Sequence, residues 1–316
     1  MKKFIITIDT EGDNLWNWGP GQPILTENTL FLERFQNLSN EYGFKPTWLS
    51  NYEMIHDDRY VAFIQNVVTN KQGELGMHLH AWNNPPQYDL PVVNNAAPYL
   101  IEYPKDVMEK KVAFLTEYIL ERTGIVPRSH RAGRWATNDD YMQLLIKYGY
   151  DCDCSFTPHI DWGNNKGQTE GSCGSNYTKC PEKPHMIQSL LEVPMTVKIC
   201  HRFPKNGLCG GIVEALRSAK HGMLGKKVWL RPNGHNLDEL KWLLDKASDD
   251  DSDYVMFMLH SSEMMPAGSP NFKTEQSIDK LYSDLKELFS YASVRFEGIT
   301  LSEFCDTWKK SMNKLQ

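Results

Sequence analysis

The sequence predicts an α/β fold in which a mainly parallel sheet or barrel is covered by helices, and three observations support this prediction. Short apolar segments typical of buried strands alternate with longer segments that have the apolar period of a helix, an order that favours parallel strands. Of the 316 residues, 41% are hydrophobic and 23% are charged, which is ordinary globular composition with enough apolar side chains for a sizeable core. No internal repeat or low-complexity tract is visible, so a solenoid is not expected.

The predicted elements follow one another in this alternating order. Residues 4–8 form an apolar, largely β-branched run typical of a buried strand, and residues 254–259 form a second one. Residues 26–42 carry apolar side chains at helical spacing, and Gly43 follows at the position where glycine commonly ends a helix. Further helices are predicted before Gly124, from Thr137 to Gly149, from Asn236, around residues 278–285 and from Ser302.

We expect the whole chain, residues 1–316, to form a single domain. The region from about 161 to 209 breaks the alternation of strands and helices, because it is rich in Gly, Asn, Lys, Cys and Pro. We interpret it as a loop excursion over one face of the domain.

Charge and cysteine content narrow the class of protein. The formal net charge of -6 provides no general attraction for nucleic acid, whose binding depends on neutralising phosphates. No apolar run is long enough to span a membrane or resembles the apolar part of a signal peptide. The seven cysteines are an odd number without a C-x-x-C pair, which indicates reduced thiols. We therefore expect a soluble cytoplasmic protein.

Three carboxylates, Asp9, Glu11 and Asp13, directly follow the first predicted strand. Chemistry in α/β barrels lies on loops at the carboxyl ends of the strands. Three negative charges this close repel one another, and a divalent cation would compensate them if the site is partly buried. An exposed acidic turn without function is the alternative interpretation.

Two histidines, His78 and His80, follow a short apolar segment and precede a Pro-Pro loop. Residues two apart in an extended segment point to the same side, so both imidazoles can reach one ion. Single histidines are mostly surface or core residues, but a pair at this spacing favours a metal site.

Two further polar residues occupy positions suited to catalysis. His260 follows the buried segment 254–259, and imidazole titrates near neutral pH, which suits proton transfer to a leaving group. Arg131 lies just before the predicted helix at residue 137, where it can hold a carboxylate through a bidentate pair; a salt bridge without catalytic meaning is the alternative.

Tryptophans are plentiful near these residues. Trp16, Trp82 and Trp135 can stack on sugar rings through their aromatic faces, which favours a carbohydrate substrate. The alternative is ordinary packing, because large aromatic side chains are common in protein cores.

Taken in order, these segments resemble the NodB-homology polysaccharide deacetylases, in particular the divergent WalW and WbmS branch associated with lipopolysaccharide O-antigen biosynthesis. The resemblance spans residues 4 to about 305. It implies a distorted (β/α) barrel of about seven parallel strands with outer helices. It also implies a divalent metal ion, usually zinc, held by one carboxylate and two histidines. The matching segments are TIDTEGD at residues 7–13, GMHLHAW at 76–82, HRAGRW at 130–135, DCSFTP at 153–158 and LHSSEMMPAG at 259–268.

The resemblance implies a role for each polar residue at a matching position. Asp9 would be the general base, Arg131 would orient it, and His260 would be the general acid. Glu11 would be the metal carboxylate, with Asp13 as the competing choice.

His78 would be the first histidine ligand of the metal. The family spaces its two histidines four residues apart, whereas Trp82 occupies the fourth position after His78 in this chain. His80 is the nearby replacement, so its role as the second nitrogen ligand is an inference.

The expected function is removal of an N-acetyl or similar acyl group from a sugar of a surface polysaccharide or its precursor by metal-dependent hydrolysis. Two alternatives stay open. One is an amidase that acts on a small cyclic amide, and the other is a non-catalytic carbohydrate-binding relative that has lost its metal.

Overall fold

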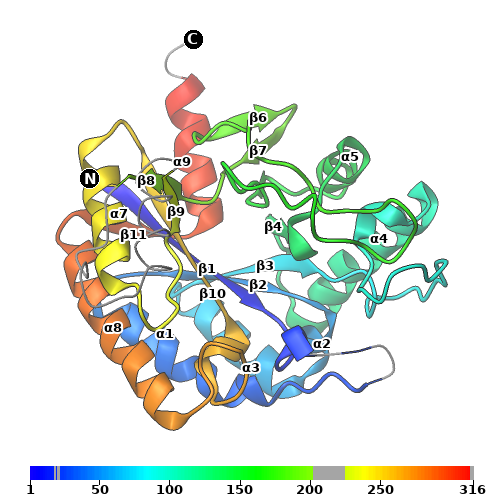
Figure 1. Cartoon of the computed structure of the whole chain (residues 1–316), viewed down its shortest axis with the longest axis horizontal. Helices are drawn as coiled ribbons and strands as arrows, with labels where there is room; N and C mark the ends of the chain where they lie inside the picture. The colour runs from blue at the N-terminus through cyan, green and yellow to red at the C-terminus, as the bar shows by residue number, and fades with distance from the viewer. Residues whose placement is uncertain (18, 20–21, 202–224, 314–316) are drawn as a thin grey trace, which may run out of the picture.

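The computed structural model describes residues 1–17, 19, 22–201 and 225–313. A curled, mostly parallel sheet occupies the centre, and helices surround it (Figure 1). Strand β1 (Lys2–Thr10) pairs along its length with β10 (Tyr254–His260). On its other edge, β11 (Phe296–Ile299) pairs with the first half of β1 and β2 (Pro46–Ser50) with the second half.

The sheet continues from β2 through four more parallel strands. These are β3 (Glu74–Leu79), β4 (Ser129–Ala132), β5 (Cys152–Asp153) and β7 (Leu190–Glu192). A short antiparallel strand, β6 (His185–Ile187), ends this path at one edge, and β10 ends it at the other. The predicted fold class, a distorted barrel of NodB type with about seven parallel strands, is confirmed as a half-barrel.

An antiparallel ribbon formed by β8 (Val197–Cys200) and β9 (Lys226–Trp229) lies next to β10. The residues that flank this ribbon bond to β10, since Thr196 Oγ1 accepts from Met256 N at 2.8 Å and Leu230 O accepts from Met258 N at 3.1 Å. The ribbon therefore extends the half-barrel past β10, the strand at which the central sheet ends.

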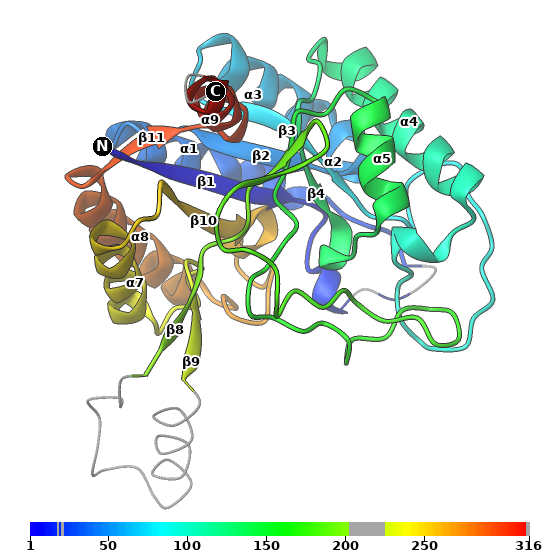
Figure 2. The same ribbon diagram turned by 90° about the horizontal axis from the view of Figure 1, so that it is seen from above.

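Helices lie on both sides of the sheet (Figure 2). Figure 2 shows α7 and α8 beside β10, and α4 and α5 beside β4. The helices are α1 (Leu32–Glu41), α2 (Tyr52–His56), α3 (Asp58–Thr69), α4 (Lys105–Thr123), α5 (Asp139–Lys147), α7 (Leu237–Asp249), α8 (Glu275–Ser293) and α9 (Leu301–Asn313). Among the described residues, none of these helices is long and apolar enough to cross a membrane.

The predicted helix ends agree closely with the structure. Gly43 and Gly124 follow α1 and α4 with positive φ angles of 72° and 71°, a backbone conformation that glycine adopts without steric cost. Asn138 caps α5 by accepting a hydrogen bond from Tyr141 N. The predicted helix over residues 26–42 is divided into a short 3₁₀ helix, η2 (Glu27–Phe31), and α1.

The region from 161 to 209 is only partly the loop excursion that the sequence predicts. Residues 161–184 contain isolated bridges but no regular strand or helix. Residues 185–200 contain β6, β7 and β8, and β7 belongs to the central sheet. Short strands of three or four residues carry too little periodicity to be recognised from sequence. Residues 202–209 lie outside the described residues, and the prediction of a single domain stays a prediction.

Side chains of β1 point alternately to the two faces of the sheet, and the buried apolar residues form one cluster on each face. Phe4, Ile6 and Ile8 are fully buried in the cluster that packs beneath the outer helices, where the ring of Phe4 stacks on Phe44 at 4.5 Å. Ile5 belongs to a second cluster on the opposite face, within the curl of the sheet. Because side chains alternate with a period of two, Asp9 shares this inner face with Ile5.

Gly76 permits β3 to pass close to its neighbours. A Cβ atom at this position would lie 2.4 Å from Ser129 Oγ, 2.7 Å from Leu49 Cδ2 and 2.9 Å from Ser129 O. We predict that Gly76→Ala lowers the free energy of unfolding by about 1–3 kcal/mol through overpacking, measured by urea denaturation.

Gly19 provides the matched control, because an added Cβ atom there meets nothing within 4 Å. Gly19→Ala should change the free energy of unfolding by less than about 0.5 kcal/mol. Equal stability of the Gly76→Ala variant and the unchanged protein would contradict the packing described for β3.

Candidate metal centre and active site

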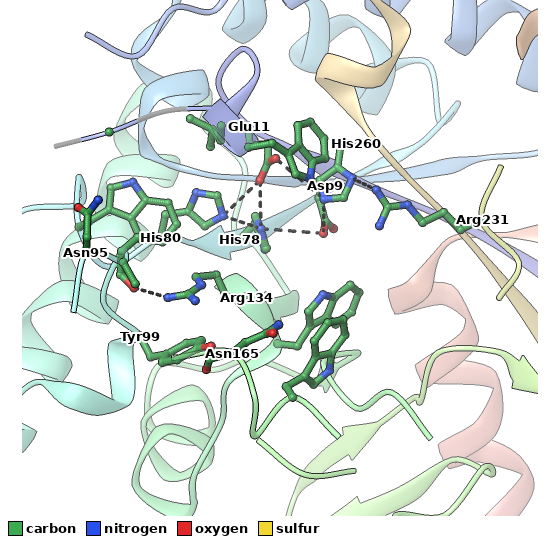
Figure 3. A pocket seen from close by; sticks show the side chains of 18 residues that line it. Asp9, Glu11, His78, His80, Asn95, Tyr99, Arg134, Asn165, Arg231 and His260 are labelled. Carbon is green, nitrogen blue, oxygen red and sulfur yellow. Dashed lines mark hydrogen bonds and ion pairs between the residues drawn. The ribbon is translucent and has the colours of Figure 1, made fainter. Parts of the chain in front are cut away.

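The polar residues singled out in the sequence meet at the carboxyl edge of the sheet (Figure 3). Asp9 of β1 is in register with His260 of β10, and His78 of β3 is in register with Arg131 of β4. Parallel strands bring all four side chains to the same edge although up to 251 positions separate them in sequence, from residue 9 to residue 260. The curl of the sheet then turns these ends toward one another.

Glu11, His78 and His80 form a buried cluster that could hold a metal ion. Glu11 Oε2 lies 3.2 Å from His80 Nε2 and 3.7 Å from His78 Nε2, and the two Nε2 atoms are 3.0 Å apart. All three residues are at most 5% exposed. One carboxylate and two imidazoles converging in this way match the donor types that a divalent ion such as zinc takes in proteins.

Hydrogen bonds fix the imidazole ring of His78 and the main chain of Glu11. His78 Nδ1 donates to the carbonyl oxygen of Arg131 at 2.9 Å, which leaves the Nε2 lone pair facing the cluster. The backbone of Glu11 is held by Ser261, whose Oγ accepts from Glu11 N and donates to Glu11 O at 3.1 Å each. Asn28 Nδ2 also donates to Glu11 O at 2.9 Å.

His80 reaches the cluster although it stands two residues after His78 and not four. Its ring stacks on the indole of Trp82 with centroids 4.3 Å apart and an interplanar angle of 23°. Its Nδ1 lies 3.4 Å from Asn51 Nδ2, and its Nε2 faces Glu11. The expected convergence of both imidazoles is therefore present in the structure.

Asp13, the competing carboxylate, lies elsewhere. Its two oxygens accept backbone hydrogen bonds from Glu27 N at 2.9 Å and Asn28 N at 3.0 Å, at the start of η2. Asp13 is thus a helix-capping residue, and the cluster that could hold a metal ion contains Glu11 in its place. The spacing in the sequence left this choice open because both carboxylates follow the same strand.

Asp9 is bound by a fully buried arginine. Arg131 Nη1 donates to Asp9 Oδ1 at 2.5 Å, and Arg131 Nη2 donates to Thr7 Oγ1 at 2.8 Å. The second oxygen of Asp9 faces the cluster, 4.0 Å from His78 Nε2 and 3.8 Å from His260 Nε2. Arg131 therefore fixes one oxygen of the Asp9 carboxylate, while the other oxygen points into the site.

The electrostatics of the site favour positive charge between the carboxylates. Burial alone would raise the pKa of Asp9, but Arg131 and the neighbouring histidines hold it below its ordinary value. Burial likewise opposes ionisation of Glu11, yet the pKa of Glu11 is lowered by His260, His78 and His80. Burial would lower the pKa of His78, and the nearby Asp9 and Glu11 raise it. The two carboxylates thus stabilise a cation at this point, whether a proton or a metal ion.

His260 is held by a pair of residues that sequence reasoning missed. Its Nδ1 lies 3.1 Å from Glu263 Oε2, and its Nε2 faces Asp9 and Glu11 at 3.8 and 3.9 Å. Glu263 is fully buried and forms an ion pair with Arg231 at 3.2 Å. Although burial would raise the pKa of Glu263, Arg231 and His260 lower it to about 2, so this carboxylate is ionised.

The cluster lies in a pocket with a volume of about 510 Å³. The predicted aromatic residues Trp16, Trp82 and Trp135 all line it, and Trp16 also contacts the ring of His260 edge-on at 4.9 Å. Several lining residues were given no role in the sequence analysis, although Arg134 lies in the matching segment at 130–135. They include Tyr99, Arg134, Asn165 and Arg231, and Trp162 lines the pocket as well.

No protein-family model matches the sequence, and no curated protein matches it at a significant level. Solved structures do resemble the fold. A protein from Mycobacterium smegmatis described as a polysaccharide deacetylase has 14% sequence identity and a TM-score of 0.53, with 99% of this chain and 92% of that chain covered.

Two further structures have lower TM-scores. A peptidoglycan deacetylase from Bacillus subtilis has 11% identity and a TM-score of 0.44, with coverage of 99% of this chain and 94% of that chain. A 4-alpha-glucanotransferase from Thermococcus litoralis has 14% identity and a TM-score of 0.49, and covers 96% of this chain and 40% of that chain. At such identities, structural likeness bears on the fold alone, and the Mycobacterium smegmatis structure, with its TM-score above 0.5, supports the half-barrel fold of this chain.

The two carboxylates after β1 provide a matched test of the metal cluster. We predict that the purified protein binds about one equivalent of zinc, and that Glu11→Ala and the His78→Ala, His80→Ala double variant lose it. Asp13→Ala should keep the metal and lose about 1 kcal/mol of unfolding free energy, because η2 loses its cap. Elemental analysis and urea denaturation measure the two quantities.

The opposite pattern, with metal retained in Glu11→Ala and lost in Asp13→Ala, would show that the wrong carboxylate has been assigned to the cluster. Absence of metal from the unchanged protein, even after incubation with zinc, would reject the metal site itself.

Proposed function

We propose that this protein is a metal-dependent hydrolase that removes an N-acetyl or similar acyl group from a sugar of a surface polysaccharide or its precursor. We assign it to the WalW and WbmS branch of the NodB-homology polysaccharide deacetylases, as the sequence resemblance implies. The observation that carries the proposal is the meeting of a carboxylate and two imidazoles with an arginine-bound carboxylate and a further histidine in one pocket. Zinc as the metal and a cytoplasmic location are part of the proposal.

The donor atoms of Glu11, His78 and His80 suit a catalytic divalent metal ion. A divalent ion held by Glu11, His78 and His80 would act as a Lewis acid toward the acyl carbonyl and lower the pKa of water. Three protein ligands, two nitrogens and one carboxylate oxygen, are typical of catalytic zinc sites, which keep a further position open. Both Nε2 atoms and Glu11 Oε2 face the same point, so no rearrangement of the chain is needed to form this set.

Asp9 is placed to act as the general base. Arg131 binds one carboxylate oxygen and favours the ionised form, while the other oxygen faces the pocket. In this role Asp9 removes a proton from water as the water oxygen forms a bond to the acyl carbon.

His260 is placed to act as the general acid. Its Nδ1 is bound to the ionised carboxylate of Glu263, an arrangement that fixes the ring with Nε2 facing the pocket. From Nε2 it donates a proton to the amine nitrogen as the carbon–nitrogen bond breaks. Water is thereby divided between the two products, since the acyl group leaves as a carboxylate and the sugar retains a free amine.

The aromatic lining of the pocket supports a carbohydrate substrate. Trp135 and Trp162 lie with parallel rings, 3° between their planes and 6.4 Å between their centroids. Trp229 packs edge-on against both of them, with centroids 5.8 and 6.1 Å away. Exposed faces of such rings provide flat apolar surfaces on which the C–H faces of a sugar can stack.

We predict acetate release from N-acetylated oligosaccharides by the zinc-loaded protein, measured with a coupled acetate assay. Asp9→Asn and His260→Ala should keep the metal and lose about 10²- to 10⁴-fold in kcat, because each removes one proton-transfer group. His56→Ala is the matched histidine control, since His56 lies on α2 bonded to Tyr118 at 2.8 Å, and its activity should equal that of the unchanged protein.

The acetate assay, run beside assays of cyclic-amide hydrolysis and of sugar binding, separates the two alternative functions. Hydrolysis of a small cyclic amide without acetate release would favour the amidase, and sugar binding without metal or turnover would favour the non-catalytic relative. Full activity in Asp9→Asn or His260→Ala would exclude the assigned residue from proton transfer.

A further inference from the structure

Arg134 places a positive charge in the pocket, and no carboxylate of the described residues forms an ion pair with it. Its Nη1 donates to Ala97 O, its Nη2 donates to Lys166 O at 2.9 Å, and its guanidinium lies 4.0 Å from the ring centroid of Tyr99. Burial lowers the pKa of Arg134 by more than the nearby Tyr99 and Glu102 raise it.

The other two arginines of the site are neutralised. Arg131 is paired with Asp9, and Arg231 is paired with Glu263. Arginine has five N–H donors, and the two carbonyl contacts of Arg134 use two of them. The Arg134 side chain lines the pocket, and Figure 3 shows it between His80 and Tyr99. Donors and charge are therefore available to a ligand beside the metal cluster.

The backbone that presents Arg134 is strained. Arg134 and Trp135 both have positive φ angles, 54° and 62°, which side-chain-bearing residues adopt rarely. The preceding Gly133 lies so close to β3 that a Cβ atom there would be 2.4 Å from Leu79 O and 2.7 Å from His80 Cδ2. The turn is thus pressed against the second histidine of the cluster, and it directs a cation and an indole into the pocket.

We propose that Arg134 forms an anion subsite, and that the acylated sugar carries an acidic group, a carboxylate or a phosphate, which the guanidinium binds. The sugar ring then lies against the wall formed by Trp135 and Trp162, and its acylamino group faces Glu11, His78 and His80. This inference rests on the proposed function and specifies its substrate class as an acidic acylamino sugar. A guanidinium fork suits both kinds of anion, because each offers two oxygens in one plane.

The competing explanation is that Arg134 only ties together the chain segments at Ala97 and Lys166. Arg134→Gln distinguishes the two, since glutamine can still donate to a carbonyl oxygen but carries no charge. Loss of a tether would weaken binding of every sugar alike, whereas loss of an anion subsite would weaken binding of acidic sugars alone.

The test uses three probes that differ only at carbon 6: N-acetylglucosamine, its 6-phosphate and its 6-carboxylate. Their dissociation constants are measured by calorimetry with the zinc-loaded protein, Arg134→Gln and the control Arg34→Gln. Arg34 is an exposed arginine on α1 that contacts Asp279 on α8. Any binding of the anions to zinc itself is common to all three proteins, so the comparison isolates the contribution of Arg134.

We expect at least one acidic probe to bind the unchanged protein at least about tenfold more tightly than the neutral sugar. Arg134→Gln should lose this preference while its affinity for the neutral sugar changes less than about twofold, and Arg34→Gln should keep the preference. The tighter of the two acidic probes identifies the anion as carboxylate or phosphate.

Equal affinity for all three probes, an equal loss for all three in Arg134→Gln, or no measurable binding of any probe would overturn the anion subsite. Acetate release from neutral sugars by the same protein would then leave the proposed function intact. Conversely, a preference for acidic probes that depends on Arg134, without any turnover, would support the subsite and reject the hydrolase.

Discussion

The buried ion pair between Asp9 and Arg131 is the interaction on which the rest of the site depends. Their strands, β1 and β4, are separated by β2 and β3, so the curl of the sheet must bring the two side chains within 2.5 Å. Losing either partner would leave an uncompensated buried charge, a change that typically costs about 3–5 kcal/mol. The same arginine accepts, through its backbone carbonyl, the hydrogen bond that orients His78. Arg131 thus positions the proposed base through its side chain and the first histidine of the candidate metal cluster through its backbone.

A second constraint is the compensation of charge in a confined space. Asp9, Glu11 and Glu263 are all at most 5% exposed, and each lies within 4 Å of a cationic or imidazole nitrogen. Each of these three carboxylates has a different cationic or imidazole neighbour. Arg131 anchors Asp9, the two histidines surround Glu11, and Arg231 holds Glu263 beneath His260. This division allows three negative groups to share one edge of a sheet and still take separate roles.

Much of this site could be predicted from the sequence, since residues after parallel strands meet at one edge whatever lies between them. That rule alone predicts that Asp9, Glu11, His78 and His260 lie together. It could not choose between Glu11 and Asp13, because only the cap of η2 decides which carboxylate turns inward. Nor could it find Glu263 as the partner of Arg231, 32 residues away, or the role of Arg134, because both depend on how loops pack. Short strands such as β7 were missed because three residues show no period.

The central claim is that one divalent ion sits between Glu11, His78 and His80. The most direct measurement is X-ray diffraction from zinc-soaked crystals at wavelengths on either side of the zinc absorption edge. The account predicts one strong anomalous peak at about 2.0–2.2 Å from a Glu11 oxygen and from both Nε2 atoms, with Asp9 and His260 facing it. A peak at the cysteines or at Asp13, or no peak at this cluster, would contradict the account.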